Sequence, residues 1–176
     1  MTTIGAETKS GFHSALTAPG RSPEIPESAD AYGWLIGSWK LDVFDYSAGP
    51  SAAPYRSEGE VHFGWVLKGR AVEDVWIMPQ RTVYGVTARV WDPSIQAWRV
   101  TWINPVSGVR DELIGRWSGK DIVQIGKHSD GAPIRWIFSE ITPDSFRWTG
   151  EVLEPDGKTW RLETEFRAKR GARSTT

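Results

Sequence analysis

The chain contains no cysteine, which excludes a disulfide framework, thiolate chemistry and any cysteine-based zinc site. It also lacks long hydrophobic runs. No segment approaches the ~18 apolar residues of a membrane span, and residues 1–20 lack the apolar core of a secretory signal. Its 21 basic residues balance 22 acidic ones, so no excess positive charge is present to hold a polyanion such as DNA. These absences predict a cytoplasmic protein that binds neither membranes nor nucleic acid.

Several site motifs are absent as well. The sequence has no glycine-rich phosphate loop, no Gly-x-Ser-x-Gly turn, no His-Glu-x-x-His pair and no calcium loop. Its histidines are His13, His62 and His128. We expect His13 and His128 to be solvated, the first in a polar arm and the second beside a Ser-Asp-Gly turn. We therefore expect neither a metal nor a cofactor.

Tryptophan, by contrast, is abundant, with 11 residues in a chain of 176. This side chain is bulky and amphipathic, and it lines cores, interfaces and aromatic cavities. The number exceeds what the core of one small domain needs. We therefore expect some of the tryptophans to face a pocket or a partner.

The length fits one domain with short flanking segments. Residues 1–28 are rich in proline and poor in apolar residues, which is typical of a flexible arm. Ser28 or Asp30 is positioned to cap a short helical turn over 31–35, and Gly37 to end it. The barrel domain is predicted over 29–170, followed by a tail at 171–176.

From residue 39 onward the pattern is one of short strands separated by turn residues such as Pro, Gly and Asp. Parallel crossovers need a dozen or more residues, so these short connections predict an antiparallel meander. A meander of this length removes its exposed edges by closing. The sequence thus predicts an all-β fold, an up-and-down β-barrel of about ten strands. The predicted strands are 39–46, 57–67, 70–78, 83–91, 97–104, 109–117, 121–127, 134–141, 145–153 and 159–168.

Alternation along these strands predicts one apolar and one polar face. In the last strand, for example, Trp160, Leu162, Thr164 and Phe166 alternate with charged residues. The strand 134–141 is apolar on both faces. We expect its outer face to be covered by the N-terminal arm or by a second subunit in a homodimer.

The entry into the first strand carries a resemblance. Gly37-x-Trp39 after a short turn is similar to the start of the calycins, which include lipocalins, fatty-acid-binding proteins and nitrobindin-like barrels. The stretch Ala88-Arg-Val-Trp-Asp-Pro with Trp98-Arg-Val-Thr-Trp102 resembles DUF1579, a bacterial group of uncharacterised lipocalin-like proteins. The likeness covers roughly residues 30–168.

The resemblance implies a barrel in which Trp39 plugs the closed end and an arginine of the last strand stacks on it. Arg167 and Arg170 are the candidates for that arginine. The haem chemistry of nitrobindin is not expected, because no histidine lies near the C-terminal strand to serve as the iron ligand.

The candidate catalytic residues are carboxyl groups on apolar faces. Asp74 lies between Val72 and Trp76, and Glu140 continues the apolar face of its strand. Burial there raises a carboxyl pKa toward neutrality, where the group can act as a general acid or base. The alternative is that each pairs with an interior arginine or sits at the barrel rim. Tyr84 is the candidate auxiliary hydroxyl donor at the mouth of the barrel.

The candidate ligand-binding residues are aromatic side chains that alternation turns inward, together with one amide. Asn104 either orients a ligand's carbonyl group or starts the turn with Pro105. A stripe of Glu58, Glu60 and His62 is interpreted as a solvent-facing surface rather than a metal site. The predicted cavity set is Trp65, Trp76, Trp102, Asn104, Trp136, Phe138, Trp148 and Trp160.

Two functions follow from this pattern. The first is a protein that binds a small apolar or aromatic metabolite in a tryptophan-lined cavity. The second is a cofactor-free enzyme, a lyase, hydratase, isomerase or cyclase, that acts on such a metabolite inside the barrel. Fold analogy does not decide between them.

Overall fold

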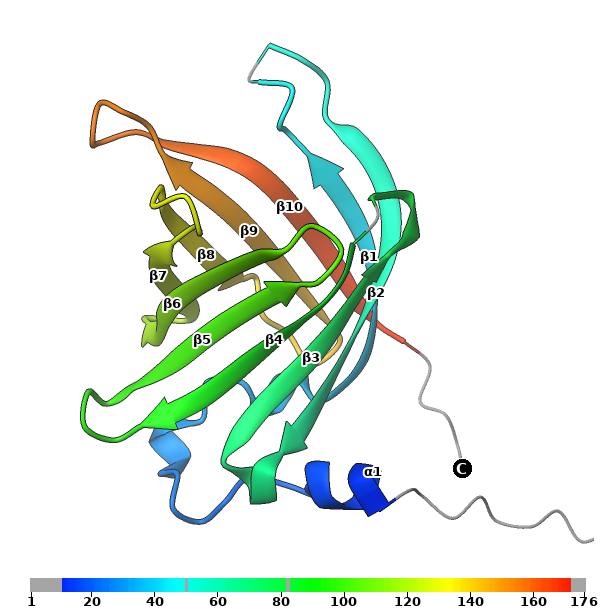
Figure 1. Ribbon diagram of the computed structural model, residues 1–176, viewed down its shortest axis with the longest axis vertical. Coiled ribbons are helices and arrows are strands. Elements are labelled where there is room, and N and C mark those ends of the chain that lie inside the picture. The colour runs from blue at the N-terminus through cyan, green and yellow to red at the C-terminus, as the bar shows by residue number, and fades with distance from the viewer. Residues whose placement is uncertain (1–10, 50, 82, 172–176) are drawn as a thin grey trace, which may run out of the picture.

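The computed structural model describes residues 11–49, 51–81 and 83–171. Within them, ten antiparallel strands each pair with their sequence neighbours, and β1 pairs with β10, so the sheet closes into a barrel (Figure 1). The strands are β1 (Gly37–Asp45), β2 (Tyr55–Val66), β3 (Ala71–Met78), β4 (Val83–Asp92), β5 (Ala97–Asn104), β6 (Val109–Ser118), β7 (Asp121–Lys127), β8 (Pro133–Ser139), β9 (Ser145–Leu153) and β10 (Trp160–Arg170).

The predicted fold class is confirmed, and every predicted strand begins and ends within two residues of an observed one. Turn residues account for this agreement, because Pro, Gly and Asp end each strand where the ladder cannot continue. Two of the connections contain a 3₁₀ turn. The 3₁₀ turns η3 (Leu67–Gly69) and η4 (Pro79–Arg81) join β2 to β3 and β3 to β4.

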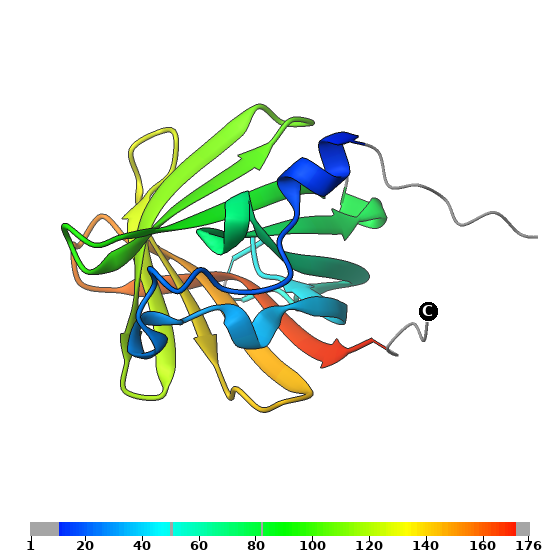
Figure 2. The same ribbon diagram turned by 90° about the horizontal axis from the view of Figure 1, so that it is seen from below.

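The N-terminal segment crosses one end of the barrel, as the blue ribbon in Figure 2 shows. It contains α1 (Gly11–Leu16), η1 (Glu27–Ala29) and η2 (Gly33–Leu35). Thr17 forms a β-bridge with Val66, the N–H of Ser22 donates to the carbonyl of Gly69, and Ile25 is buried. The expected flexible arm is therefore held against the barrel from residue 11 onward. Residues 1–10 lie outside the described part of the chain.

The predicted helical turn before the first strand is present as η2. Its N-cap residue is Tyr32. Of the two predicted capping residues, Asp30 contacts the start of the turn, since one carboxylate oxygen accepts hydrogen bonds from the backbone N–H groups of Tyr32 (3.3 Å) and Gly33 (2.7 Å). This turn inserts Tyr32 and Leu35 into the barrel end, where both are fully buried.

Trp39 occupies the same closed end. Its indole N–H donates to the carbonyl of Leu35 at 2.7 Å, and its ring meets Phe146 at a centroid distance of 4.8 Å. The guanidinium of Arg170 lies 4.0 Å from the Trp39 ring centroid. The arginine–tryptophan contact that the resemblance implied is thus made by Arg170. Arg167 instead lies over Phe44.

Arg170 also links the N-terminal segment to the β8–β9 connection at the closed end of the barrel. It donates hydrogen bonds to the carbonyl oxygens of Trp34 (2.9 Å), Ile36 (3.1 Å) and Pro143 (2.8 Å). These carbonyls belong to the N-terminal segment and to the β8–β9 connection. One side chain therefore satisfies three backbone acceptors that lack strand partners.

The alternation of faces holds along most strands but reverses in β10. A register shift between Leu162 and Thr164 marks a β-bulge. Trp160 pairs with Leu153 before the bulge and packs outside the barrel under the guanidinium of Arg135, 4.5 Å from the ring centroid. The prediction that Trp160 and Leu162 share the inner face with Thr164 and Phe166 is therefore wrong, because the bulge adds one residue between the two pairs.

Candidate functional site

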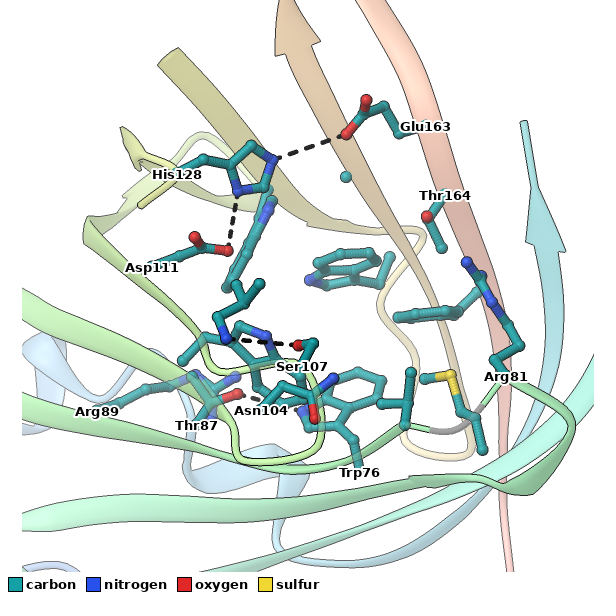
Figure 3. A pocket seen from close by; sticks show the side chains of 18 residues that line it. Trp76, Arg81, Thr87, Arg89, Asn104, Ser107, Asp111, His128, Glu163 and Thr164 are labelled. Atoms are coloured by element: carbon teal, nitrogen blue, oxygen red, sulfur yellow. Dashed lines mark hydrogen bonds and ion pairs between the residues drawn. The ribbon is translucent and has the colours of Figure 1, made fainter. Parts of the chain in front are cut away.

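The interior of the barrel is hollow toward the end opposite Trp39. A cavity of about 260 Å³ runs from Arg89 in the middle of the barrel to the strand ends at Arg81, His128 and Glu163 (Figure 3). Five of its 18 lining residues are aromatic. The aromatic lining residues are Trp76, Trp102, Trp136, Trp148 and Phe166.

The aromatic walls support one another. Trp148 stacks on Phe166, with centroids 4.6 Å apart and ring planes 14° apart, and Trp76 lies 5.0 Å from Phe166. Gly150 faces the cavity beside these rings, and a Cβ atom there would lie 2.8 Å from the ring of Trp148. Glycine at this position therefore lets the Trp148 ring lie flat along the wall, which leaves the space in front of it open.

A buried ion pair lies at the inner end of the cavity. The Arg89 guanidinium donates to one carboxylate oxygen of Asp74 at 2.5 Å, and the backbone N–H of Thr87 donates to the other at 2.9 Å. The side chains of Asp74 and Arg89 are 0% and 1% exposed. Burial raises the pKa of the Asp74 carboxyl, while Arg89 and Thr87 act in the opposite direction.

Aromatic rings surround the guanidinium of Arg89. Its central carbon lies 5.1 Å from the ring centroid of Tyr32, 5.5 Å from that of Phe63 and 5.8 Å from that of Phe138. The Tyr32 hydroxyl donates to Gln124 at 3.2 Å, and burial raises the pKa of Tyr32. This cluster separates the packed half of the barrel from the hollow half.

Polar side chains from three elements meet at the mouth of the cavity. Asp111 comes from β6, His128 from the turn after β7, and Glu163 from the bulge in β10. The Nδ1 atom of His128 lies 3.0 Å from Asp111, and its Nε2 atom lies 3.7 Å from Glu163. Figure 3 shows the imidazole ring between the two carboxylates.

The two carboxylates favour the charged imidazolium and raise the pKa of His128 to about 10. His128 in turn lowers the pKa of Glu163, with further help from Arg161. Among the described residues, no group of three or more histidine or acidic side chains is arranged to hold a metal ion. The mouth therefore carries a proton-bearing donor beside anionic acceptors.

Five of the eight residues predicted to bind a ligand line this cavity. Two others belong to the packed half: Phe138 is fully buried near Tyr32, and Trp65 lies against Trp98. Trp160 packs outside the barrel. Asn104 lines the cavity but also accepts a hydrogen bond from the N–H of Val106, so it does start the turn. The five lining residues are Trp76, Trp102, Asn104, Trp136 and Trp148.

The three predicted catalytic residues lie in separate places. Asp74 is inside the barrel and paired with Arg89, which was the alternative considered from the sequence. Tyr84 is 59% exposed and does not line the cavity. Glu140 is exposed just after β8, at the closed end of the barrel. The structure does not bring these three side chains together.

Sequence reasoning missed the mouth cluster. Asp111 alternates with Val109 and Leu113, so the same alternation that indicates an inward Asp74 also indicates an inward Asp111. His128, expected to be solvated, is instead only 30% exposed and is paired with the buried Asp111. No signal marked Glu163, since only the bulge turns it toward His128.

Comparisons with known proteins give no family. No family model matches the chain, and no curated protein matches it. Among solved structures, one described as "Structure of EF1p2_mFAP2b bound to DFHBI" has 12% identity and a TM-score of 0.40, covering 82% of this chain and 100% of that one. Another, described as the de novo design of a fluorescence-activating β-barrel, has 16% identity and a TM-score of 0.36, covering 81% of this chain and 98% of that one.

The identities and TM-scores of both structures are low. The fold assignment therefore rests on the strand pairing of this chain. The resemblance to calycins and to DUF1579 stays a prediction. What the structure establishes is a closed ten-stranded antiparallel barrel with an aromatic-walled cavity near one end.

Proposed function

We propose that this protein binds a small apolar or aromatic molecule inside the barrel. The observation that carries the proposal is the cavity walled by Trp76, Trp136, Trp148 and Phe166. Ligand sites are typically concave and apolar, with a few polar groups that fix orientation. This cavity has that composition, since its polar residues gather at the mouth and at the inner end.

The volume limits the size of the ligand. A dry apolar cavity of roughly 150 Å³ accommodates benzene, and drug-sized pockets begin at about 300 Å³. The cavity here measures about 260 Å³. A compound of one or two rings is therefore the expected size, and a long acyl chain or a haem is too large.

Binding is favoured over chemistry at the inner end. Both carboxylate oxygens of Asp74 already accept hydrogen bonds from Arg89 and Thr87, which leaves Asp74 poorly placed to exchange protons with a ligand. The mouth cluster around His128 is the feature that supports the enzyme alternative, a cofactor-free lyase, hydratase, isomerase or cyclase. Mass spectrometry of a compound before and after incubation separates the two, because a carrier returns it unchanged.

The experiment is a titration of one- and two-ring aromatic compounds, followed by intrinsic tryptophan fluorescence. We expect saturable quenching or a shift in emission, because ligand rings would contact four indoles. The variant Thr164→Phe fills the cavity and should abolish the response, and Thr101→Phe, on the outer face of β5, should leave it intact. An unchanged emission across the whole series contradicts the proposal.

The remaining expectations about partners and location stay predictions. A homodimer and a cytoplasmic location follow from the sequence analysis alone. In the described part of the chain, no helix has the length and apolar character needed to cross a membrane.

A further inference from the structure

The mouth of the cavity contains a gap between a donor and an acceptor. His128 Nε2 and the nearer oxygen of Glu163 are 3.7 Å apart, which is too far for a direct hydrogen bond. The other side of the imidazole is fixed, because Nδ1 lies 3.0 Å from the buried Asp111. Asp111 in turn accepts a hydrogen bond from the N–H of Ser129. The Nε2 atom is therefore held in place with its donor capacity unused within the described residues.

The two sides of the gap differ in chemistry. His128, whose pKa is raised to about 10, carries protons on both ring nitrogens at neutral pH. Its Nε2 can only donate, and the ionised Glu163 can only accept. A group placed between them must accept one hydrogen bond and donate another. A hydroxyl group does both, whereas an ether or a carboxylate only accepts and an ammonium only donates.

Charge at the mouth disfavours an anionic ligand group. The imidazolium offsets one carboxylate, and Arg161 is shared between Glu163 and Glu154. This cluster therefore has no excess positive charge to bind an anion. Both His128 and Glu163 line the cavity whose inner walls are aromatic.

We propose that the ligand is an aromatic alcohol, a phenol or naphthol, whose hydroxyl lies between His128 and Glu163 while its rings lie among the tryptophans. This inference rests on the proposed function and narrows it to a class of compound. The hydroxyl oxygen accepts from Nε2 of His128, and the hydroxyl hydrogen is donated to Glu163. Both bonds involve a charged partner and are therefore stronger than neutral ones.

The first test compares three probes of nearly the same shape, namely 2-naphthol, 2-methoxynaphthalene and naphthalene, by isothermal titration calorimetry. The methoxy compound can accept from His128 but cannot donate to Glu163. We expect 2-naphthol to bind about tenfold or more tightly than 2-methoxynaphthalene, since the methoxy compound lacks the charge-assisted hydrogen bond to Glu163. Equal affinities for the two compounds overturn the inference while leaving the proposed function standing. Failure of all three probes to bind overturns the proposed function as well.

The second test asks whether Glu163 is responsible for the tighter binding of 2-naphthol than of 2-methoxynaphthalene. Glu163→Met removes the acceptor, and Glu154→Met is the matched control, because Glu154 also binds Arg161 but does not line the cavity. We expect Glu163→Met to bind 2-naphthol no better than 2-methoxynaphthalene and Glu154→Met to keep the preference. A preference that survives in Glu163→Met contradicts the inference. The probe comparison on the unmodified protein decides the question if Glu163→Met does not fold.

Discussion

The two ends of this barrel use the same kind of side chain in different ways. At the closed end, Trp34, Trp39 and Phe146 pack edge to face, with centroid distances between 4.8 and 6.2 Å. At the other end, Trp148 and Phe166 stack flat against the wall and leave a cavity in front of them. The closed end is filled because the N-terminal segment inserts Tyr32 and Leu35 there. No described segment is inserted at the other end in the same way. Aromatic residues thus form packed core where another segment of the chain is inserted against them, and they line a cavity where none is.

The border between the two halves is polar. The Asp74–Arg89 pair is fully buried, and Tyr32 lies against Arg89 from the closed side. Gly115 makes this approach possible, because a Cβ atom there would lie 2.2 Å from the Tyr32 hydroxyl. A packed aromatic core on one side and an open cavity on the other therefore meet at one ion pair.

The comparison predicts unequal losses of stability. Trp39→Ala should lower the free energy of unfolding by about 3–5 kcal/mol, because it empties a fully packed site. Trp136→Ala should cost less than about 2 kcal/mol, because part of that ring already borders open space. Urea denaturation of the two variants measures both values. Equal losses would contradict the division into filled and hollow halves.

The buried Asp74–Arg89 pair predicts a second large loss in the free energy of unfolding. Arg89→Met should cost about 3–5 kcal/mol, because it leaves the Asp74 carboxylate buried without its partner. Adding Asp74→Leu should recover part of that loss, since no unpaired charge remains. Arg56→Met, which breaks the exposed pair with Asp42, is the control and should cost under about 1 kcal/mol. Additive losses in the double variant, measured by denaturation, would show that the pair does not act as a unit.

The contacts of Arg170 at the packed end predict an intermediate loss in the free energy of unfolding. Arg170→Lys keeps the charge but loses the fork that reaches three carbonyl groups. We expect a loss of about 1–3 kcal/mol in the free energy of unfolding. Arg167→Lys, on the exposed side of Phe44, should change stability by less than about 0.5 kcal/mol. If thermal denaturation shows the two substitutions to be equivalent, Arg170 does not fasten the barrel end.

The mouth of the cavity predicts a pH dependence of stability. The pKa of His128 is raised from about 6.5 to about 10, so the folded state binds its proton more tightly than the unfolded state. This contribution to stability is complete below about pH 6.5 and is lost as the pH rises to about 10. The difference in stability between the unmodified protein and His128→Gln should therefore shrink over that range. An NMR titration that places the His128 pKa near 6.5 would contradict the ion pairs at the mouth.

The sequence predicted the barrel because strand patterns and turn residues are local signals. Five cavity residues, Trp76 and Trp136 among them, followed from alternation in the same way. The positions of Trp160 and Glu163 did not follow from it, since the bulge at Glu163 has no local signature in the sequence. Alternation also did not predict that Trp65 and Phe138 lie in the packed half, because it gives the face on which a residue lies but not its height along the barrel.

The most direct test of the two halves uses the indole N–H signals of the 11 tryptophans in a ¹⁵N–¹H NMR spectrum during titration with 2-naphthol. We expect saturable shifts for Trp76, Trp102, Trp136 and Trp148, which line the cavity. We expect little change for Trp39 and Trp98, whose N–H groups donate to the carbonyls of Leu35 and Ala29 in the packed half. Shifts confined to Trp39 and Trp98, or no shifts at any tryptophan, would contradict the division of the barrel into a packed and a hollow half.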